Sequence, residues 1–68
     1  MLKGTIYAIK VKFEEKENGF IAWIPALKNI AALGQTEEEA YKNVLKVQKD
    51  YLKFLTTNNK EIPKSDLN

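Results

Sequence analysis

The residue types that most often carry out catalysis are almost absent from this sequence of 68 residues. It contains no histidine and no cysteine, and its only serine, Ser65, lies near the C-terminus without a base in the neighbouring sequence. The usual Ser–His–Asp and Cys–His constellations are therefore excluded. Glu14, Glu15 and Glu17 cluster within one charged turn, whereas a two-metal hydrolase needs carboxylates that converge from several elements. We therefore expect that the protein is not an enzyme and has no catalytic residue, metal ligand or cofactor-binding residue.

Four lysines recur at helical spacing, which places them on one face of a helix. A basic stripe of this kind can follow the phosphates of a nucleic acid. No arginine accompanies it, and we expect the nearby Tyr51 and Phe54 to point toward the core. The net charge of +2 is too small to argue for nucleic-acid binding by itself, so a solvated outer face is the plainer interpretation. The nucleic-acid face that we keep as an alternative consists of Lys42, Lys46, Lys49 and Lys53.

The only tryptophan, Trp23, and its neighbour Ile21 are expected on the face of a predicted strand that the helix leaves uncovered. Tryptophan is enriched among the residues that dominate the binding energy of interfaces. Trp23 has two interpretations that the sequence leaves open: a core residue beneath a loop, or an anchor for a partner. Leu27, in the loop after that strand, is a further candidate anchor. The candidate partner-binding residues are thus Ile21, Trp23 and Leu27.

Three short stretches are expected to form the sheet. Residues 6–13 alternate with period two and are rich in β-branched and aromatic residues, which predicts a strand. Asn18-Gly19 is a frequent hairpin pair, so we expect a turn there, a second strand over residues 20–24 that ends before Pro25, and a short third strand over residues 30–33. The first strand is expected to direct toward the core Tyr7, Ile9, Val11 and Phe13. The open face of the sheet is expected to carry Ile6, Ala8, Ile21 and Trp23.

A helix is expected over residues 37–55, because apolar residues recur there at helical spacing. Thr36 can cap its first turn, and Glu39 can return a hydrogen bond to the backbone N–H of Thr36. Glu37, Glu38 and Glu39 place negative charge at the positive end of the helix dipole, so a structural role explains this acidic cluster. Glu38 also precedes Lys42 by four residues, which is a favourable order for an ion pair. The core face is expected to contain Ala40, Val44, Val47, Tyr51 and Leu55.

Together these elements predict one α+β domain over residues 1–68, with a three-stranded antiparallel sheet, one long helix packed on one face and a short extended tail. A chain of this size is marginally stable alone and has no cysteine for disulfides, so we expect a homo-oligomer, either a dimer or a tetramer. An apolar patch on the open sheet face would fit such an interface. No apolar run is long enough for a signal peptide or a membrane span, so we expect a cytoplasmic protein.

The order and spacing of several short motifs resemble the HicB antitoxin family of type II toxin–antitoxin systems. The resemblance runs without gaps over residues 19–40 and continues on the helix and in the tail. The motifs that carry it are Gly19-Phe20-x-Ala22, Pro25-x-Leu27, Gly34-x-Thr36, Glu38-Glu39-Ala40 with Asn43, and Ile62-Pro63-x-Ser65. The chain departs from the family pattern in the loop between the second and third strands, where the family often has an aspartate and a Pro-Gly-Cys. It is also too short for the C-terminal DNA-binding domain of full-length members and for a full fourth strand.

The resemblance implies a partially degraded RNase H-like domain without nuclease activity, which binds a small basic ribonuclease toxin, HicA, and blocks its active site. Trp23 and Leu27 would be anchors in such a complex, and an orphan of such a pair is equally consistent with the motifs. The positive net charge argues against capture of a basic toxin, since charge complementarity favours an acidic partner. Two alternatives remain: a nucleic-acid-binding module that uses the helix lysines, and a structural homo-oligomer that associates through the Ile21/Trp23 face or an open sheet edge.

Overall fold

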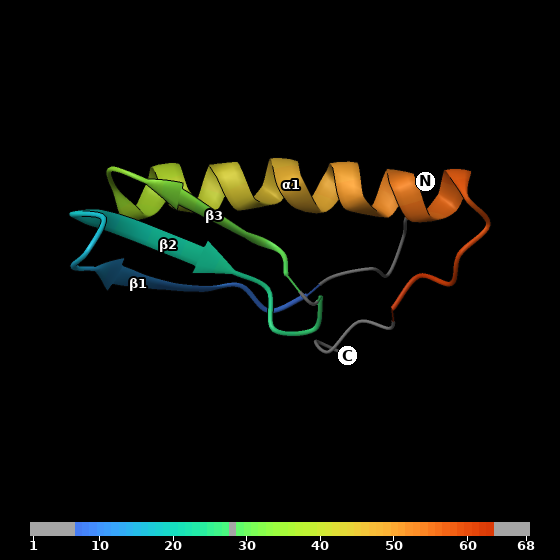
Figure 1. Ribbon diagram of the computed structural model, residues 1–68, viewed down its shortest axis with the longest axis horizontal. Helices are drawn as coiled ribbons and strands as arrows, with labels where there is room; N and C mark the ends of the chain where they lie inside the picture. Colours follow the sequence, from blue (N-terminus) through green and yellow to red (C-terminus); the bar gives the residue numbers. More distant parts are fainter. Residues whose placement is uncertain (1–6, 28, 64–68) are drawn as a thin grey trace.

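The computed structural model describes residues 7–27 and 29–63, and it contains three strands followed by one helix (Figure 1). The strands are β1 (Lys10–Glu14), β2 (Gly19–Trp23) and β3 (Ala31–Gly34), and the helix is α1 (Glu37–Thr57). The strands form one antiparallel sheet in the order β1-β2-β3, and α1 lies across one face of it (Figure 1). The predicted α+β fold with the order β-β-β-α is confirmed.

The boundaries of the elements differ from the predicted ones by one to four residues. Residues 7–9 precede β1 rather than forming part of it, and Ile6 lies outside the described residues. The second strand begins one residue earlier than expected, the third is displaced by one residue, and the helix extends two residues further. Residues 60–63 of the tail belong to no helix or strand, and the remainder of the tail lies outside the described part of the chain.

The hairpin between β1 and β2 closes where Glu14 pairs with Gly19. Asn18 has a φ of 51°, and its backbone N–H donates to the carbonyl oxygen of Glu15 over 3.1 Å. Asparagine adopts this left-handed conformation more readily than most residues, because its short polar side chain tolerates it. The turn predicted from Asn18-Gly19 is therefore confirmed.

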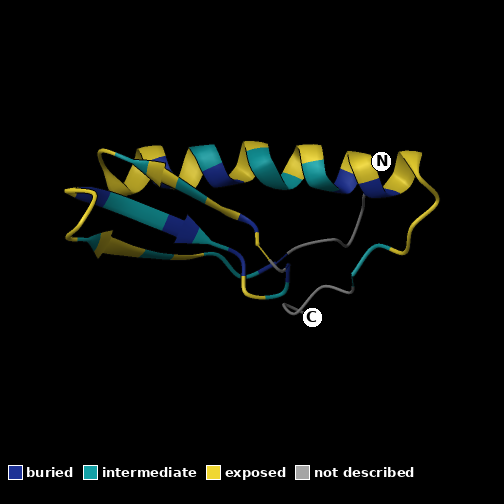
Figure 2. Ribbon diagram, viewed as in Figure 1, coloured by how far each residue is buried: buried dark blue, intermediate teal, exposed yellow. Residues whose placement is uncertain are grey.

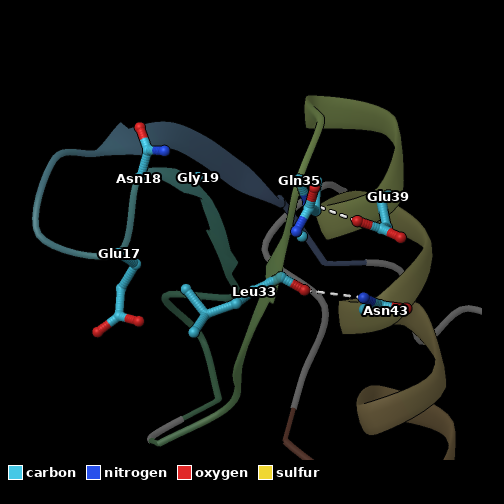
Figure 3. Close-up of a pocket in the computed structure, with 8 residues that line it drawn as sticks. Glu17, Asn18, Gly19, Leu33, Gln35, Glu39 and Asn43 are labelled. Carbon is cyan, nitrogen blue, oxygen red and sulfur yellow. Dashed lines mark hydrogen bonds between the residues drawn. The ribbon is translucent and has the colours of Figure 1, made fainter.

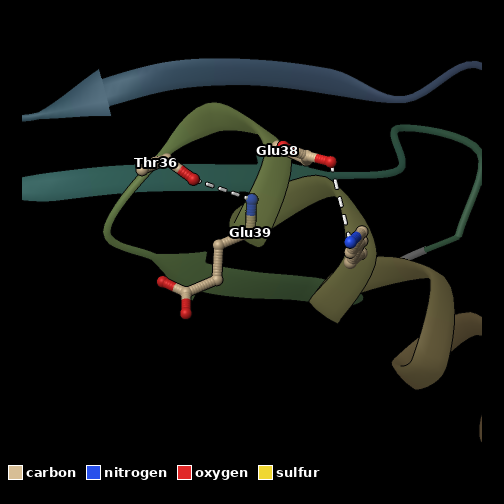
Figure 4. A network of polar contacts seen from close by, with 4 residues as sticks. Thr36, Glu38 and Glu39 are labelled. Atoms are coloured by element: carbon tan, nitrogen blue, oxygen red, sulfur yellow. Dashed lines mark hydrogen bonds and ion pairs between the residues drawn. The ribbon is translucent and has the colours of Figure 1, made fainter.

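The start of α1 is capped by the side chains of Thr36 and Glu39, and Figure 4 shows the hydrogen bond that Thr36 makes. Thr36 Oγ1 accepts from the backbone N–H of Glu39 over 3.0 Å, as predicted. The Glu39 carboxylate, however, accepts from the backbone N–H of Gln35, one residue before the expected donor. The predicted ion pair between Glu38 and Lys42 is present at 3.6 Å, although both side chains are more than two-thirds exposed. The helix start is thus held chiefly by the capping hydrogen bonds, since exposed ion pairs contribute little.

Gly34 allows the first turn of α1 to approach β3 more closely than any other residue type would permit. A Cβ atom at this position would lie 2.3 Å from the Ala40 nitrogen and 2.8 Å from the Ala40 Cα. Since these are backbone atoms, no side-chain rotation could relieve the contact. The Gly-x-Thr motif therefore has a packing role: its glycine permits the close approach and its threonine begins the helix.

The core lies between α1 and the sheet, and it continues beyond the strands beneath the second half of the helix (Figure 2). The helix has 21 residues and is about 31 Å long, whereas a five-residue strand covers only about 17 Å. The loop between β2 and β3 and the tail fill the space beneath the last turns. Ile62 packs against the core, and the Tyr7 hydroxyl donates to the Pro63 carbonyl oxygen. The buried residues are Tyr7, Ala22, Ile24, Leu27, Ile30, Ala40, Val44, Leu52 and Leu55.

Two aromatic residues that were predicted to face the core are exposed. Phe13 is 53% exposed, because α1 packs mainly on β3 and β2 and covers β1 least. Its ring instead meets the edge of the Phe20 ring, with 5.4 Å between centroids. Phe54 is 55% exposed, because it lies in the part of α1 that extends past the strands. Among the described residues, no helix is both long and apolar enough to span a membrane.

Candidate functional site

The sheet face opposite α1 carries an apolar cluster that no other element in the described part of the chain covers. Side chains alternate across a strand, so the fully buried Ala22 points toward α1, while Ile21 and Trp23 point to the other face. Ile21 and Trp23 are partly buried, and Leu33, which lies opposite Ile21 in β3, is 46% exposed. The strand registers define the residues of this surface, which we call the open face: Lys10, Lys12, Ile21, Trp23, Ala31 and Leu33.

Trp23 lies on the open face, at the end of the central strand β2, and not in the core. It pairs with Lys10 on one side and with Ala31 on the other. The Lys12 ammonium lies over the indole ring, 5.9 Å from its centroid, which is within the range of a cation–π interaction. Of the two interpretations of Trp23, the structure therefore removes the one in which it fills the core beneath a loop.

Leu27 is 2% exposed and belongs to the core, so it has no surface to offer a partner. Its loop turns inward because three backbone hydrogen bonds close it. The N–H of Leu27 donates to the Ile24 carbonyl, the N–H of Ile30 donates to the Leu27 carbonyl, and the N–H of Ile24 donates to the Ile30 carbonyl. The sequence suggested an exposed anchor because Leu27 follows Pro25 in a loop. The structure needs this side chain beneath the part of α1 that no strand reaches.

The helix lysines lie on the outer side of α1, and each of them is exposed. Lys42 is ion-paired with Glu38, which lowers the positive charge at that end of the stripe. The structure therefore brings the predicted basic residues together on one face, well away from the open face of the sheet. The set consists of Lys42, Lys46, Lys49 and Lys53.

A shallow hollow separates the β1–β2 hairpin from the start of α1 (Figure 3). Two carboxylates, Glu17 and Glu39, lie on its wall, together with Asn43. The polar groups of α1 in this hollow already have partners, since Glu39 accepts from Gln35 and the Asn43 amide donates to the Leu33 carbonyl over 2.8 Å. No group of three or more histidine, cysteine, aspartate or glutamate residues suited to a metal ion occurs within residues 7–27 and 29–63.

A protein of Synechocystis sp. that is described as a UPF0150 protein is 35% identical to this chain over 63 residues. The alignment covers 91% of this chain and 80% of that protein. The chain belongs to the UPF0150 family. No family model matches the chain, and no solved structure matches it.

In this UPF0150 protein the fold also gathers most of the acidic residues at one end, which the sequence did not reveal. The tip of the β1–β2 hairpin and the start of α1 lie at the same end of the molecule, because β3 runs antiparallel to β2 and leads directly into the helix (Figure 1). Six glutamates that are far apart in the sequence thereby form one acidic end: Glu14, Glu15, Glu17, Glu37, Glu38 and Glu39.

Leu33 and Ala31 are open-face residues that were not predicted from the sequence. The period-two pattern of residues 30–33 held the signal, because it places Leu33 and Ala31 on one face and Ile30 and Ala32 on the other. The register with β2 was needed to show that Leu33 lies beside Ile21. The open face of this UPF0150 protein therefore spans all three strands.

Proposed function

We propose that this UPF0150 protein is a non-catalytic antitoxin domain of the HicB type, which binds a small HicA-like ribonuclease toxin. Membership in UPF0150 supports this, because that family corresponds to the HicB-like antitoxins. The ordered motifs between Gly19 and Ala40, with Ile62-Pro63 in the tail, support the same function. The proposed mechanism is steric: the domain covers the active site of the toxin.

The observation that carries this proposal is the apolar centre of the open face. Ile21, Trp23 and Leu33 lie side by side on neighbouring strands, and no other strand or helix in the described part of the chain covers them. Leu33 is 46% exposed, and Ile21 and Trp23 are partly buried. Large exposed apolar groups that a fold does not need for its own core are typical of interaction surfaces. A tryptophan on such a surface is suited to fill a pocket of a partner and to exclude water from its surroundings.

The acidic end answers the objection that a protein of net charge +2 is a poor partner for a basic toxin. Charge complementarity acts over the contacted surface rather than over the whole molecule. The lysines of α1 lie on its outer side, whereas six glutamates gather at the hairpin end next to the sheet. We propose that the toxin meets the open face through apolar contacts and extends basic residues toward the acidic end.

The test is to mix the protein with the product of the adjacent reading frame and to measure complex formation and RNA cleavage. We expect Trp23→Ala to weaken the complex by roughly 30-fold or more, as loss of an interface residue worth about 2 kcal/mol would do. Phe54→Ala is the matched control, because it removes another partly exposed aromatic side chain from the far side of the fold. The control is expected to bind within about threefold of the wild type.

Two results would contradict different parts of the proposal. Unchanged RNA cleavage in the presence of excess wild-type protein would remove the antitoxin function and leave an orphan domain. Full inhibition by both the wild type and Trp23→Ala would keep the function and remove the open face as its site.

A nucleic-acid-binding module is the alternative function, and the exposure of all four helix lysines favours it. It requires binding that weakens steeply with salt, since neutralised phosphates release counterions. The double variant Lys46→Ala/Lys49→Ala is expected to reduce both the affinity and the salt dependence. Binding that is indifferent to salt, or no binding of RNA at low salt, would remove this alternative.

A further inference from the structure

The outer edge of β1 is the one long side of the sheet that α1 does not protect. Asn43 donates to the Leu33 carbonyl, so this flank of α1 lies over the free edge of β3. Tyr41 precedes Asn43 by two residues and Leu45 follows it by two. Two residues correspond to a rotation of about 200° around the helix axis. Both side chains therefore lie on the flank of α1 opposite Asn43, toward β1. Tyr41 is 45% exposed and Leu45 is 36% exposed, and Phe13 on β1 is 53% exposed. An uncovered apolar strip thus runs beside the edge of β1.

The backbone of β1 has hydrogen-bonding groups directed outward at two positions. The N–H of Ile24 donates to the Ile30 carbonyl, which shows that even-numbered residues of the β2 segment bond toward β3. Successive residues of an antiparallel strand bond to opposite sides. The backbone groups of Ile21 and Trp23 therefore form hydrogen bonds with β1, where their partners are Lys12 and Lys10. The β1 residues that alternate with these two lysines direct their backbone groups away from β2. Those residues are Val11 and Phe13, and no strand in the described part of the chain pairs with them.

We propose that a second copy of this chain pairs antiparallel with β1 about a two-fold axis at Lys12, which joins the two sheets into one of six strands. In this register Val11 of each copy lies opposite Phe13 of the other. Each of these two residue pairs exchanges two backbone hydrogen bonds, so the outward N–H and C=O groups of Val11 and Phe13 are all paired. The two helices then lie on the same face of the joined sheet. The exposed Phe13, Tyr41 and Leu45 of each copy face the apolar strip of the other.

Charge disfavours one of the two neighbouring registers and backbone pairing disfavours the other. The two-fold axis places Lys10 opposite Glu14 of the second copy, and it does so twice, whereas a shift by two residues in one direction would place Lys10 opposite Lys12. A shift by two residues in the second direction would still place Lys12 opposite Glu14, but it would place Val11 opposite Glu15, outside β1. Opposite charges directly across two strands are favourable and like charges are unfavourable. Lysines on an edge strand normally discourage pairing with other chains. The lysines of β1 therefore discourage pairing with any strand that does not place a glutamate opposite Lys10.

The central pair of Lys12 side chains is the one unfavourable contact of this arrangement, and the fold already lessens it. Lys12 leans across its own sheet onto Trp23, with the ammonium 5.9 Å from the ring centroid. This orientation takes the charge toward β2 and away from the two-fold axis. Lys10 and Lys12 belong to both surfaces, but the second copy would lie on the opposite side of β1 from Trp23, so dimerisation leaves Trp23 available to another partner.

A charge-swap experiment tests the proposal, with the dimer dissociation constant measured by sedimentation of the full chain. Lys10→Glu and Glu14→Lys each convert two favourable pairs into two repulsive ones, so each is expected to raise the dissociation constant about tenfold. The double variant Lys10→Glu/Glu14→Lys restores two opposite pairs, and it is expected to return within about threefold of the wild type. Trp23→Glu is the control for association through the open face, and it is expected to leave the dimer intact.

The outcomes are decisive in either direction. Weakening by both single variants together with rescue by the double variant supports the edge-to-edge dimer. A wild type that stays monomeric at millimolar concentration overturns it, and so does a double variant no better than the singles. Dissociation by Trp23→Glu alone overturns it in favour of association through the open face. Failure of toxin inhibition has no bearing on these results, because the dimer is measured without a toxin.

Discussion

Replacing Gly34 by alanine measures how much of the stability depends on the close contact between α1 and β3. The added Cβ would lie 2.3 Å from the Ala40 nitrogen, whereas uncharged heavy atoms that are not bonded pack at about 3.5–4.0 Å. The start of α1 must therefore withdraw by more than about 1 Å. A gap of 0.5–1 Å already removes about a quarter to a half of the dispersion energy between the separated surfaces.

The residues that lose contact are among the most completely buried in the molecule. Ala40 and Val44 are both 0% exposed and face the sheet from the first two turns of α1. We expect a loss of about 2–4 kcal/mol, at the upper end of overpacking changes. The total stability of a chain of 68 residues is about 3–10 kcal/mol, so the midpoint of thermal unfolding should fall by roughly 10–30 °C.

Thermal unfolding followed by far-ultraviolet circular dichroism measures this change, and Gly19→Ala is the graded control. The Cβ of that variant would meet a single backbone atom, the Gly34 oxygen, at 2.8 Å, so its effect should be smaller. Replacing Ala40 by glycine in the Gly34→Ala background should give no rescue, because the clash is with backbone atoms. A Gly34→Ala variant within about 0.5 kcal/mol of the wild type would refute the close packing that we describe, since glycine-to-alanine changes without strain are neutral or stabilising.

Two further predictions concern the helix cap and the core. Thr36→Ala removes the hydroxyl that accepts from the Glu39 N–H, and it should lower the free energy of unfolding in urea by about 1 kcal/mol. Thr36→Asp should retain the cap. Equal losses in both variants would contradict a capping role. Leu52→Ala should lower the free energy of unfolding by about 2–5 kcal/mol, because the Leu52 side chain is 2% exposed. Phe54 lies two residues away but is 55% exposed, so Phe54→Ala should lower it far less in the same assay. The reverse order would show that the two helix faces are wrongly assigned.

The two proposals can be tested separately, because the dimer is measured without a toxin and the toxin complex is tested through Trp23, although Lys10 and Glu14 belong to both surfaces. Trp23 belongs to the open face and points away from α1, while Phe13 and its outward backbone groups belong to the edge of β1. If both proposals hold, one dimer would present two open faces on the same side of a continuous sheet. It would then bind two toxin molecules, and a monomer would bind one.

Much of the local structure was predictable because local signals agree with one another. Thr36 and Glu39 mark the helix start, Asn18-Gly19 marks the hairpin, and the alternation over residues 6–13 marks the first strand. Errors arose where burial depends on coverage by a distant element. Phe13 continues the alternation of apolar residues in β1, yet its side chain is exposed. Leu27 lies in a loop, yet its side chain is buried.

The sequence by itself determined the class of the fold, the element order and the absence of the common catalytic side chains, because composition, periodicity and capping are local properties. The tertiary structure decided that α1 lies over β2 and β3, and this placement left the edge of β1 and the open face uncovered. It also brought the glutamates of the hairpin and those of the helix start to one end. These features depend on the register of the strands and on the path of the helix across them, which arise from packing between segments far apart in the sequence.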